Sequence, residues 1–134
     1  MTSTIERPTR TAEIAAAVEV TSSLLGSTDY STLPEVWGLD ITPGRVRGQV
    51  AAYPLSKAAA LMEWRHAIPG AITTARPAPA QGEGRWYAEV LATIAGVHLS
   101  LWTVIEPTEA QAERLERDPQ TAYAVLADLA RAAA

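Results

Sequence analysis

The amino-acid sequence predicts an α+β fold in which helices pack on an antiparallel sheet of about five strands. Apolar residues recur at helical spacing in residues 11–25, and they alternate in residues 85–106 on both sides of Ala95-Gly96. The segments between residues 25 and 85 and after residue 106 contain short strand-like runs and residues that are typical of helix N-termini. The predicted order is therefore α-β-β-α-β-β-β-α-α, and strands that follow one another are expected to pair.

The composition is that of one folded domain. The chain has 134 residues, of which 48% are hydrophobic and 19% charged. We expect residues 1–10 to form a flexible N-terminal arm and residues 11–134 to form a single domain. The sequence has no cysteine, no apolar run of membrane-spanning length and no secretory signal, so we expect a cytoplasmic protein that does not enter membranes.

Charge is distributed unevenly along the chain. The net charge is −4, but residues 41–86 hold six basic residues against two acidic ones, while the segments before and after are each acidic. All basic residues except Lys57 are arginines, a bias that we attribute to a GC-rich bacterial genome. The basic middle is either an anion-binding face or ordinary surface whose charges pair locally.

The first helix is predicted over residues 11–25. Gly26 follows at the position where a left-handed residue commonly ends a helix. The apolar stripe consists of Ile14, Ala17, Val18, Thr21, Leu24 and Leu25.

A first hairpin is predicted from strands at residues 35–41 and 46–53. Proline cannot take the positive φ that common two-residue hairpin turns need, so we expect a longer or bulged loop at Thr42-Pro43-Gly44. In the first strand one face carries Trp37, Leu39 and Ile41. In the second strand the inward residues are Val46, Gly48, Val50 and Ala52, and the outward residues are Arg45, Arg47 and Gln49.

The second helix is predicted to begin after Ser56, a good N-cap, and to end before Pro69-Gly70. Its inward stripe is Leu61, Trp64 and Ile68. A short strand is expected over residues 71–76. The Pro- and Gly-rich residues 77–84 are predicted to be the most flexible loop.

A second hairpin over residues 85–106 has a well-specified register. If Ala95-Gly96 is a two-residue turn, every second pair from Ile94 with Val97 to Trp86 with Ile105 lies on one almost wholly apolar face. A shift of one residue would destroy this agreement. Arg85 falls opposite Glu106, where we expect an exposed ion pair.

Two helices are predicted to complete the chain. Thr108 and Gln111 match a capping box at the start of the first, which runs to Arg117. Asp118-Pro119 is typical of an N-cap followed by proline, and it begins the second helix. The apolar positions of that helix are Ala122, Val125, Leu126 and Leu129.

The other face of the second hairpin is the leading candidate site. It is more apolar and aromatic than a face turned only to water, which indicates a surface that binds a protein partner or a second copy of the chain. The alternative is that one of the chain's own helices covers it. The candidate partner-binding residues are Tyr87, Glu89, Leu91, Trp102 and Val104.

The outward arginines of the first hairpin are a second candidate. Arg45 and Arg47 share a strand face, and guanidinium groups suit phosphate and carboxylate. They predict an anion-binding stripe and, as an alternative function, a nucleic-acid accessory protein. The acidic balance of the chain and the lack of a recognition motif disfavour that alternative.

No pattern of residues indicates catalysis, a cofactor or a metal site. His66 and His98 are the only histidines and lie in no metal-binding motif, and no nucleophile elbow or phosphate loop is present. We therefore expect a non-catalytic interaction module, such as an adaptor, inhibitor or accessory subunit, without a cofactor. A small-molecule site or enzyme pocket near Trp64 and His66 is a further alternative.

Overall fold

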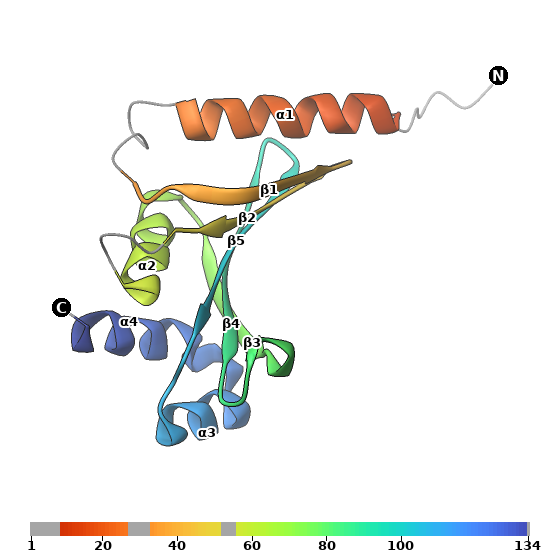
Figure 1. Cartoon of the computed structure of the whole chain (residues 1–134). Coiled ribbons are helices and arrows are strands. Elements are labelled where there is room, and N and C mark those ends of the chain that lie inside the picture. The colour runs from red at the N-terminus through yellow and green to blue at the C-terminus, as the bar shows by residue number, and fades with distance from the viewer. Residues whose placement is uncertain (1–8, 27–32, 52–55, 134) are drawn as a thin grey trace.

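Five strands form one sheet at the centre of the molecule, with α-helices against it (Figure 1). The computed structural model describes residues 9–26, 33–51 and 56–133. The elements run in the order α1 (Arg10–Gly26), β1 (Val36–Thr42), β2 (Arg45–Val50), α2 (Lys57–Ala67), β3 (Ile72–Pro77), η1 (Pro79–Gln81), β4 (Trp86–Ile94), β5 (Val97–Ile105), α3 (Glu109–Arg117), η2 (Pro119–Thr121) and α4 (Ala122–Ala132), where η1 and η2 are single 3₁₀ turns. The predicted α+β class and the predicted order of helices and strands are confirmed.

The strands lie in the order β1-β2-β5-β4-β3. Three neighbouring pairs are antiparallel, as predicted, but β2 and β5 are parallel. α2 separates β2 from β3 along the chain, and these two strands do not pair. The last strand of the following three-stranded unit, rather than its first, then lies beside β2.

The β4–β5 hairpin has the predicted register along its whole length, from Trp86 opposite Ile105 to Ile94 opposite Val97. The turn residues Ala95 and Gly96 both have positive φ, +50° and +79°. Positive φ at both central positions defines a type I′ turn, whose twist matches that of the flanking strands. At the open end of the hairpin, Arg85 Nε lies 3.2 Å from Glu106 Oε1, so the predicted ion pair is present.

The β1–β2 connection is shorter than predicted. Thr42 pairs directly with Arg45, so the loop has only two residues and the prediction of a longer or bulged loop was wrong. Gly44 has a φ of +72°. A type II turn accepts proline at its first central position and a glycine with positive φ at its second, which is the sequence found here.

The irregularity of this hairpin lies inside β1 instead. The register shifts between Trp37 and Asp40, and Gly38 between them has a φ of +57°. Such a bulge reverses the direction of the side chains that precede it. Ile41 pairs with the buried Val46, but Trp37 pairs with Gln49 on the opposite face, so the prediction that Trp37 shares a face with Leu39 and Ile41 was wrong.

The predicted helix caps are present. The Ser56 hydroxyl accepts a hydrogen bond from the Ala59 backbone N–H at 3.1 Å at the start of α2. Thr108 and Gln111 form both bonds of the capping box that begins α3. Asp118 caps the 3₁₀ turn that leads into α4.

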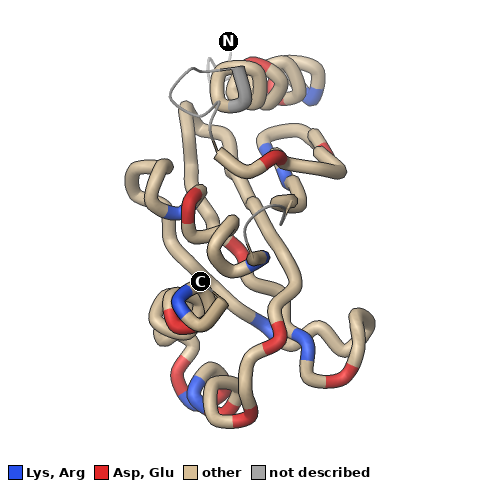
Figure 2. Tube along the Cα trace, turned by 60° about the vertical axis from the view of Figure 1, so that its left-hand side comes forward, with Lys and Arg blue, Asp and Glu red and all other residues tan. Residues whose placement is uncertain are grey.

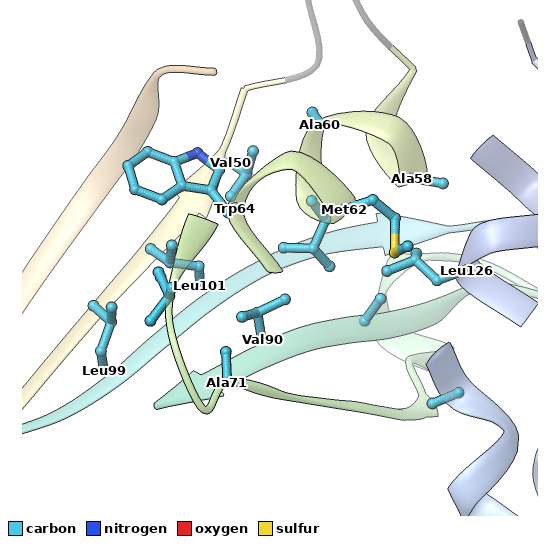
Figure 3. Packing of buried hydrophobic residues seen from close by; sticks show 14 of the residues in the cluster. Val50, Ala58, Ala60, Met62, Trp64, Ala71, Val90, Leu99, Leu101 and Leu126 are labelled. Atoms are coloured by element: carbon cyan, nitrogen blue, oxygen red, sulfur yellow. The ribbon is translucent and has the colours of Figure 1, made fainter. Parts of the chain in front are cut away.

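One apolar cluster joins the helices to the sheet. The predicted inward residues of α2, namely Leu61, Trp64 and Ile68, are at most 2% exposed, and the Trp64 indole donates a hydrogen bond to the Pro34 carbonyl at 2.8 Å. Figure 3 shows Trp64 beside Val50, with further α2, α4 and sheet residues around them. α1 lies across the end of the sheet near the β4–β5 turn (Figure 1), and it adds Ala17, Val20 and Leu24 to the same cluster.

The chain's first segment is only partly covered by the structure. Residues 1–8 of the predicted N-terminal arm lie outside the described residues, and α1 already begins at Arg10. Ala52, predicted to point inward, lies outside them as well. Among the helices of the described ranges, none combines the length and the apolar composition needed to cross a membrane.

The type I′ turn generates a prediction about stability. A left-handed backbone costs alanine about 1 kcal/mol but is better tolerated by asparagine, so Ala95→Asn is expected to raise the free energy of unfolding by up to about 1 kcal/mol. Ala95→Val, whose branched side chain tolerates positive φ poorly, is expected to lower it. Urea denaturation of both variants checks this, and shifts of the same sign would contradict the assigned turn.

The close approach of β1 to β2 generates another prediction. A β-carbon on the buried Gly48 would overlap Cγ1 of Val36, so Gly48→Ala is expected to destabilise the protein by about 1–3 kcal/mol. Val36→Ala removes the overlapping atom. In denaturation experiments the double variant should therefore lose less stability than the sum of the two single variants, and strict additivity would show that this contact is not the cause.

Candidate functional site

The face of the sheet opposite the α-helices is the candidate site, and we call it the open face. In the described part of the chain no α-helix lies over it (Figure 1). The alternative that a helix of the same chain covers this face is thus not what those residues show. The strand registers place sixteen residues on it: Trp37, Asp40, Arg45, Arg47, Gln49, Ile72, Thr74, Arg76, Tyr87, Glu89, Leu91, Thr93, His98, Ser100, Trp102 and Val104.

Both predicted sets of site residues lie on this one face. The parallel pairing sets Arg45 beside His98 and Arg47 beside Ser100. The predicted partner-binding residues of β4 and β5, namely Tyr87, Glu89, Leu91, Trp102 and Val104, therefore share a surface with the predicted anion-binding arginines. Neither hairpin alone specifies this, because it depends on which strands of the two hairpins meet.

Two arginines and two aromatic rings form a continuous row across four strands, which we call the Arg–aromatic row. The Arg47 guanidinium lies 5.1 Å from the centre of the Trp102 ring. Trp102 meets Tyr87 edge to face, with 5.6 Å between ring centres. On the far side, the Arg76 guanidinium lies 4.7 Å from the centre of the Tyr87 ring. Each contact restrains its two side chains and is favourable by about 0.5–1.5 kcal/mol.

Glu89 anchors one end of this row. Its Oε1 accepts a bond from Arg76 Nε at 3.1 Å, and its Oε2 accepts one from the Ser100 hydroxyl at 2.9 Å. The Glu89 side chain is only 14% exposed, whereas that of Arg76 is 58% exposed. Glu89 thus neutralises Arg76 and holds its guanidinium over Tyr87.

Arg45 and Arg47 have no such counterpart. Neither makes an ion pair with any residue that the structure describes. Asp40 lies opposite Arg47 in the β1–β2 register, but their charged groups are not in contact. The guanidinium groups of the two arginines are therefore not bound by a carboxylate of the described residues, although Asp40 lies opposite Arg47 and Glu13 of α1 lines a hollow together with Arg45.

The open face is hollowed between β2 and β3. A cavity of about 800 Å³ lies there, open to solvent. Arg45, Arg47 and His98 line one side, Ile72 and Arg76 line the other, and Leu91 and Ser100 lie between them. Its lining therefore combines apolar surface with unpaired cations.

The connection from β3 to β4 closes the lower end of the open face. It was predicted as the most flexible loop, and it contains the 3₁₀ turn η1, whose Gln81 side chain donates to the Tyr87 hydroxyl at 3.2 Å. Val104 is 7% exposed and so offers little surface of its own. Accessible surface is concentrated toward the hollow and β1.

Sequence reasoning missed two residues of this face, Trp37 and Ile72. Each is 56% exposed. Trp37 was assigned to the same face as Leu39 and Ile41 because the bulge was not anticipated, although Gly38 inside a strand pattern is a recognised signal of one. Ile72 is brought to the face only by the pairing of β3 with Leu91 on β4.

Trp64 and His66, the other predicted site, lie apart from the open face. Trp64 is buried in the core between α2 and the sheet. His66 is exposed on α2, where Nε2 lies 2.9 Å from the Tyr123 hydroxyl. Arg65 lies over the same Tyr123 ring at 5.1 Å, and we call Arg65, His66 and Tyr123 the Tyr123 cluster. It belongs to the helical side of the molecule, on α2 and α4.

Charged side chains are spread along the described part of the chain. Across residues 9–26, 33–51 and 56–133, no three histidine or acidic side chains lie close enough together to hold a metal ion. Figure 2 shows basic and acidic residues interspersed along the chain rather than gathered into one basic block. The open face itself mixes Arg45, Arg47 and Arg76 with Asp40 and Glu89.

Comparison with known proteins leaves function to be inferred from this geometry. No protein-family model matches the chain, and no curated protein or solved structure matches it either. The open face, with its Arg–aromatic row and its hollow, is therefore the feature from which a function can be inferred.

The role of Glu89 generates a testable prediction. Glu89→Ala removes the acceptor of the nearly buried Ser100 hydroxyl, so we expect the free energy of unfolding to fall by about 1–2 kcal/mol. The more exposed pairing with Arg76 should contribute little of this. Glu116→Ala, at an exposed position of α3, is the control and should change stability by less than about 0.5 kcal/mol. Equal denaturation midpoints for the two variants would contradict the structural role of Glu89.

Proposed function

We propose that the protein is a non-catalytic interaction module, such as an adaptor, inhibitor or accessory subunit, which binds a protein partner through the open face. The observation that carries this proposal is the Arg–aromatic row on a sheet face that no described helix covers. Tryptophan, tyrosine and arginine are the residue types that contribute most to binding energy in protein interfaces.

The arrangement of these side chains supports binding as well as their chemistry. Ordering flexible side chains costs about 0.5–1.5 kcal/mol for each one that an interface immobilises. Stacking and the Glu89 bonds already restrain Arg47, Trp102, Tyr87 and Arg76 in the free protein. A partner that docks on this face would incur less of that cost.

Nucleic-acid binding is a second candidate because Arg45 and Arg47 are unpaired among the described residues. Aromatic rings beside basic residues are also typical of single-strand binding. Two features count against it. Phosphate contacts supply most of the affinity for nucleic acids, and this chain is acidic overall. The acidic Glu89 also lies in the middle of the face.

A small-molecule site is a third candidate, supported by the volume of the hollow, which falls in the usual range for ligand pockets. Against it, pockets for small molecules enclose most of the ligand surface, and this hollow is open to solvent. An extended partner suits its shape better.

The interaction proposal predicts that Tyr87→Ala with Trp102→Ala strongly weakens partner binding and leaves the fold intact. The partner is first captured from host lysate after nuclease treatment, identified by mass spectrometry and then titrated as a purified protein. We expect affinity to fall by at least about thirtyfold, as for residues that dominate an interface. Circular dichroism and thermal unfolding report on the fold.

A matched control uses the Tyr123 cluster, which has similar chemistry on the helical side. His66→Ala with Tyr123→Ala should leave affinity unchanged. If the double variant does not fold, the affinity of the single variant Tyr87→Ala for the partner is measured instead. Loss of binding only in the Tyr123 cluster variant would contradict the proposal.

A further inference from the structure

At each end of the Arg–aromatic row an arginine lies over an aromatic ring, but only one of the two arginines binds a carboxylate. At one end Arg76 lies over Tyr87 and also binds the carboxylate of Glu89 at 3.1 Å. The end on β3 and β4 is thus a complete unit of an aromatic ring, a guanidinium and a carboxylate. It is an internal example of an arginine of this face that is stacked on a ring and binds a carboxylate.

At the other end the carboxylate is missing. Arg47 lies over Trp102 at 5.1 Å, as Arg76 lies over Tyr87, but it makes neither a hydrogen bond nor an ion pair with a side chain of the described residues. The N–H donors of a guanidinium lie in its plane and match both oxygens of a carboxylate. Arg47 is therefore a restrained donor group without an acceptor.

Arg45 extends this arrangement along β2. It lies two residues before Arg47 on the same face, a separation of about 6.6 Å in a strand. Alternate residues of an extended partner segment have the same spacing. Leu91 and Ile72, across the hollow from the two arginines, offer apolar surface to the side chains that lie between the acidic ones.

We propose that the open face binds an extended acidic segment of a partner protein, with one carboxylate bound by Arg47 and a second, two residues away, bound by Arg45. This inference rests on the proposed interaction function and specifies the chemistry of the partner. The pattern it requires is acidic residues at alternate positions of a strand-like segment.

The charge of the face favours such a segment over a nucleic acid. Affinity for nucleic acid grows with the number of phosphates neutralised, and only Arg45 and Arg47 are unpaired here among the described residues of the open face. A short acidic segment needs only two cations.

The experiment measures fluorescence anisotropy with a short labelled peptide in which glutamate alternates with threonine. The comparison probes are the same peptide with glutamine for glutamate, a peptide of the same composition with its glutamates adjacent, and labelled single-stranded oligothymidine. The full chain is titrated up to millimolar concentration at low ionic strength, and its association state is measured by analytical ultracentrifugation.

We expect the alternating peptide to bind more tightly than all three comparison probes, and added salt to weaken its binding. Arg47→Gln should lower its affinity at least about tenfold, because charge-assisted bonds are lost. Arg47→Lys should recover only part of it, since lysine lacks the planar donor pair. Asp40→Asn should leave binding unchanged or tighten it, because Asp40 is the only acid near Arg47 in the β1–β2 register.

Arg65→Gln is the matched control, because Arg65 also lies over an aromatic ring but belongs to the Tyr123 cluster. It should bind the peptide normally. The inference is overturned if no peptide binds, if oligothymidine binds as tightly, or if Arg47→Gln and Arg65→Gln behave alike. A dimer that dissociates on Arg47→Gln would also overturn it, in favour of a second copy of the chain.

Failure of this inference differs from failure of the interaction proposal. A captured partner that is lost with Trp102 and Tyr87 but retained by Arg45→Gln with Arg47→Gln would refute acidic recognition alone. A partner that is insensitive to all four changes would refute both.

Discussion

The parallel pairing of β2 with β5 is the contact on which the rest of the structure depends. An isolated two-stranded hairpin has only marginal stability in water. The pairing of β2 with β5 joins the β1–β2 hairpin to the three-stranded unit of β5, β4 and β3. The joined sheet has one continuous apolar face, on which residues of α1, α2 and α4 complete the core. The same pairing brings Arg47 to Trp102, so it creates the core and the open face together.

Much of this fold is predictable because several segments carry strong local signals. The β4–β5 register follows from the alternation of apolar residues, since a shift by one residue would turn that whole set toward water. Ser56, Thr108 with Gln111, and Asp118 mark helix starts through bonds that span three residues or fewer. These features need no knowledge of distant parts of the chain.

The remaining features depend on contacts between distant segments or on turn geometry that single residues leave open. Pro43 excludes the primed turns but not a type II turn, and the bulge at Gly38 decides where Trp37 points. Trp37 and Ile72 were missed, but the residues that β2 and the β4–β5 hairpin contribute to the two halves of the open face were predicted. That the halves adjoin was not, because no local pattern in β2 indicates that its neighbour will be β5.

The pairing of β2 with β5 joins residues about fifty positions apart in the sequence, such as Arg47 and Ser100. Contacts of such long range are costly in chain entropy and tend to form late in folding. The stacking of Arg47 on Trp102 therefore exists only in chains whose sheet is fully assembled. A ligand that contacts both β2 and β5 would bind folded molecules and not partly folded ones. By mass action it would also stabilise the β2–β5 pairing against local opening.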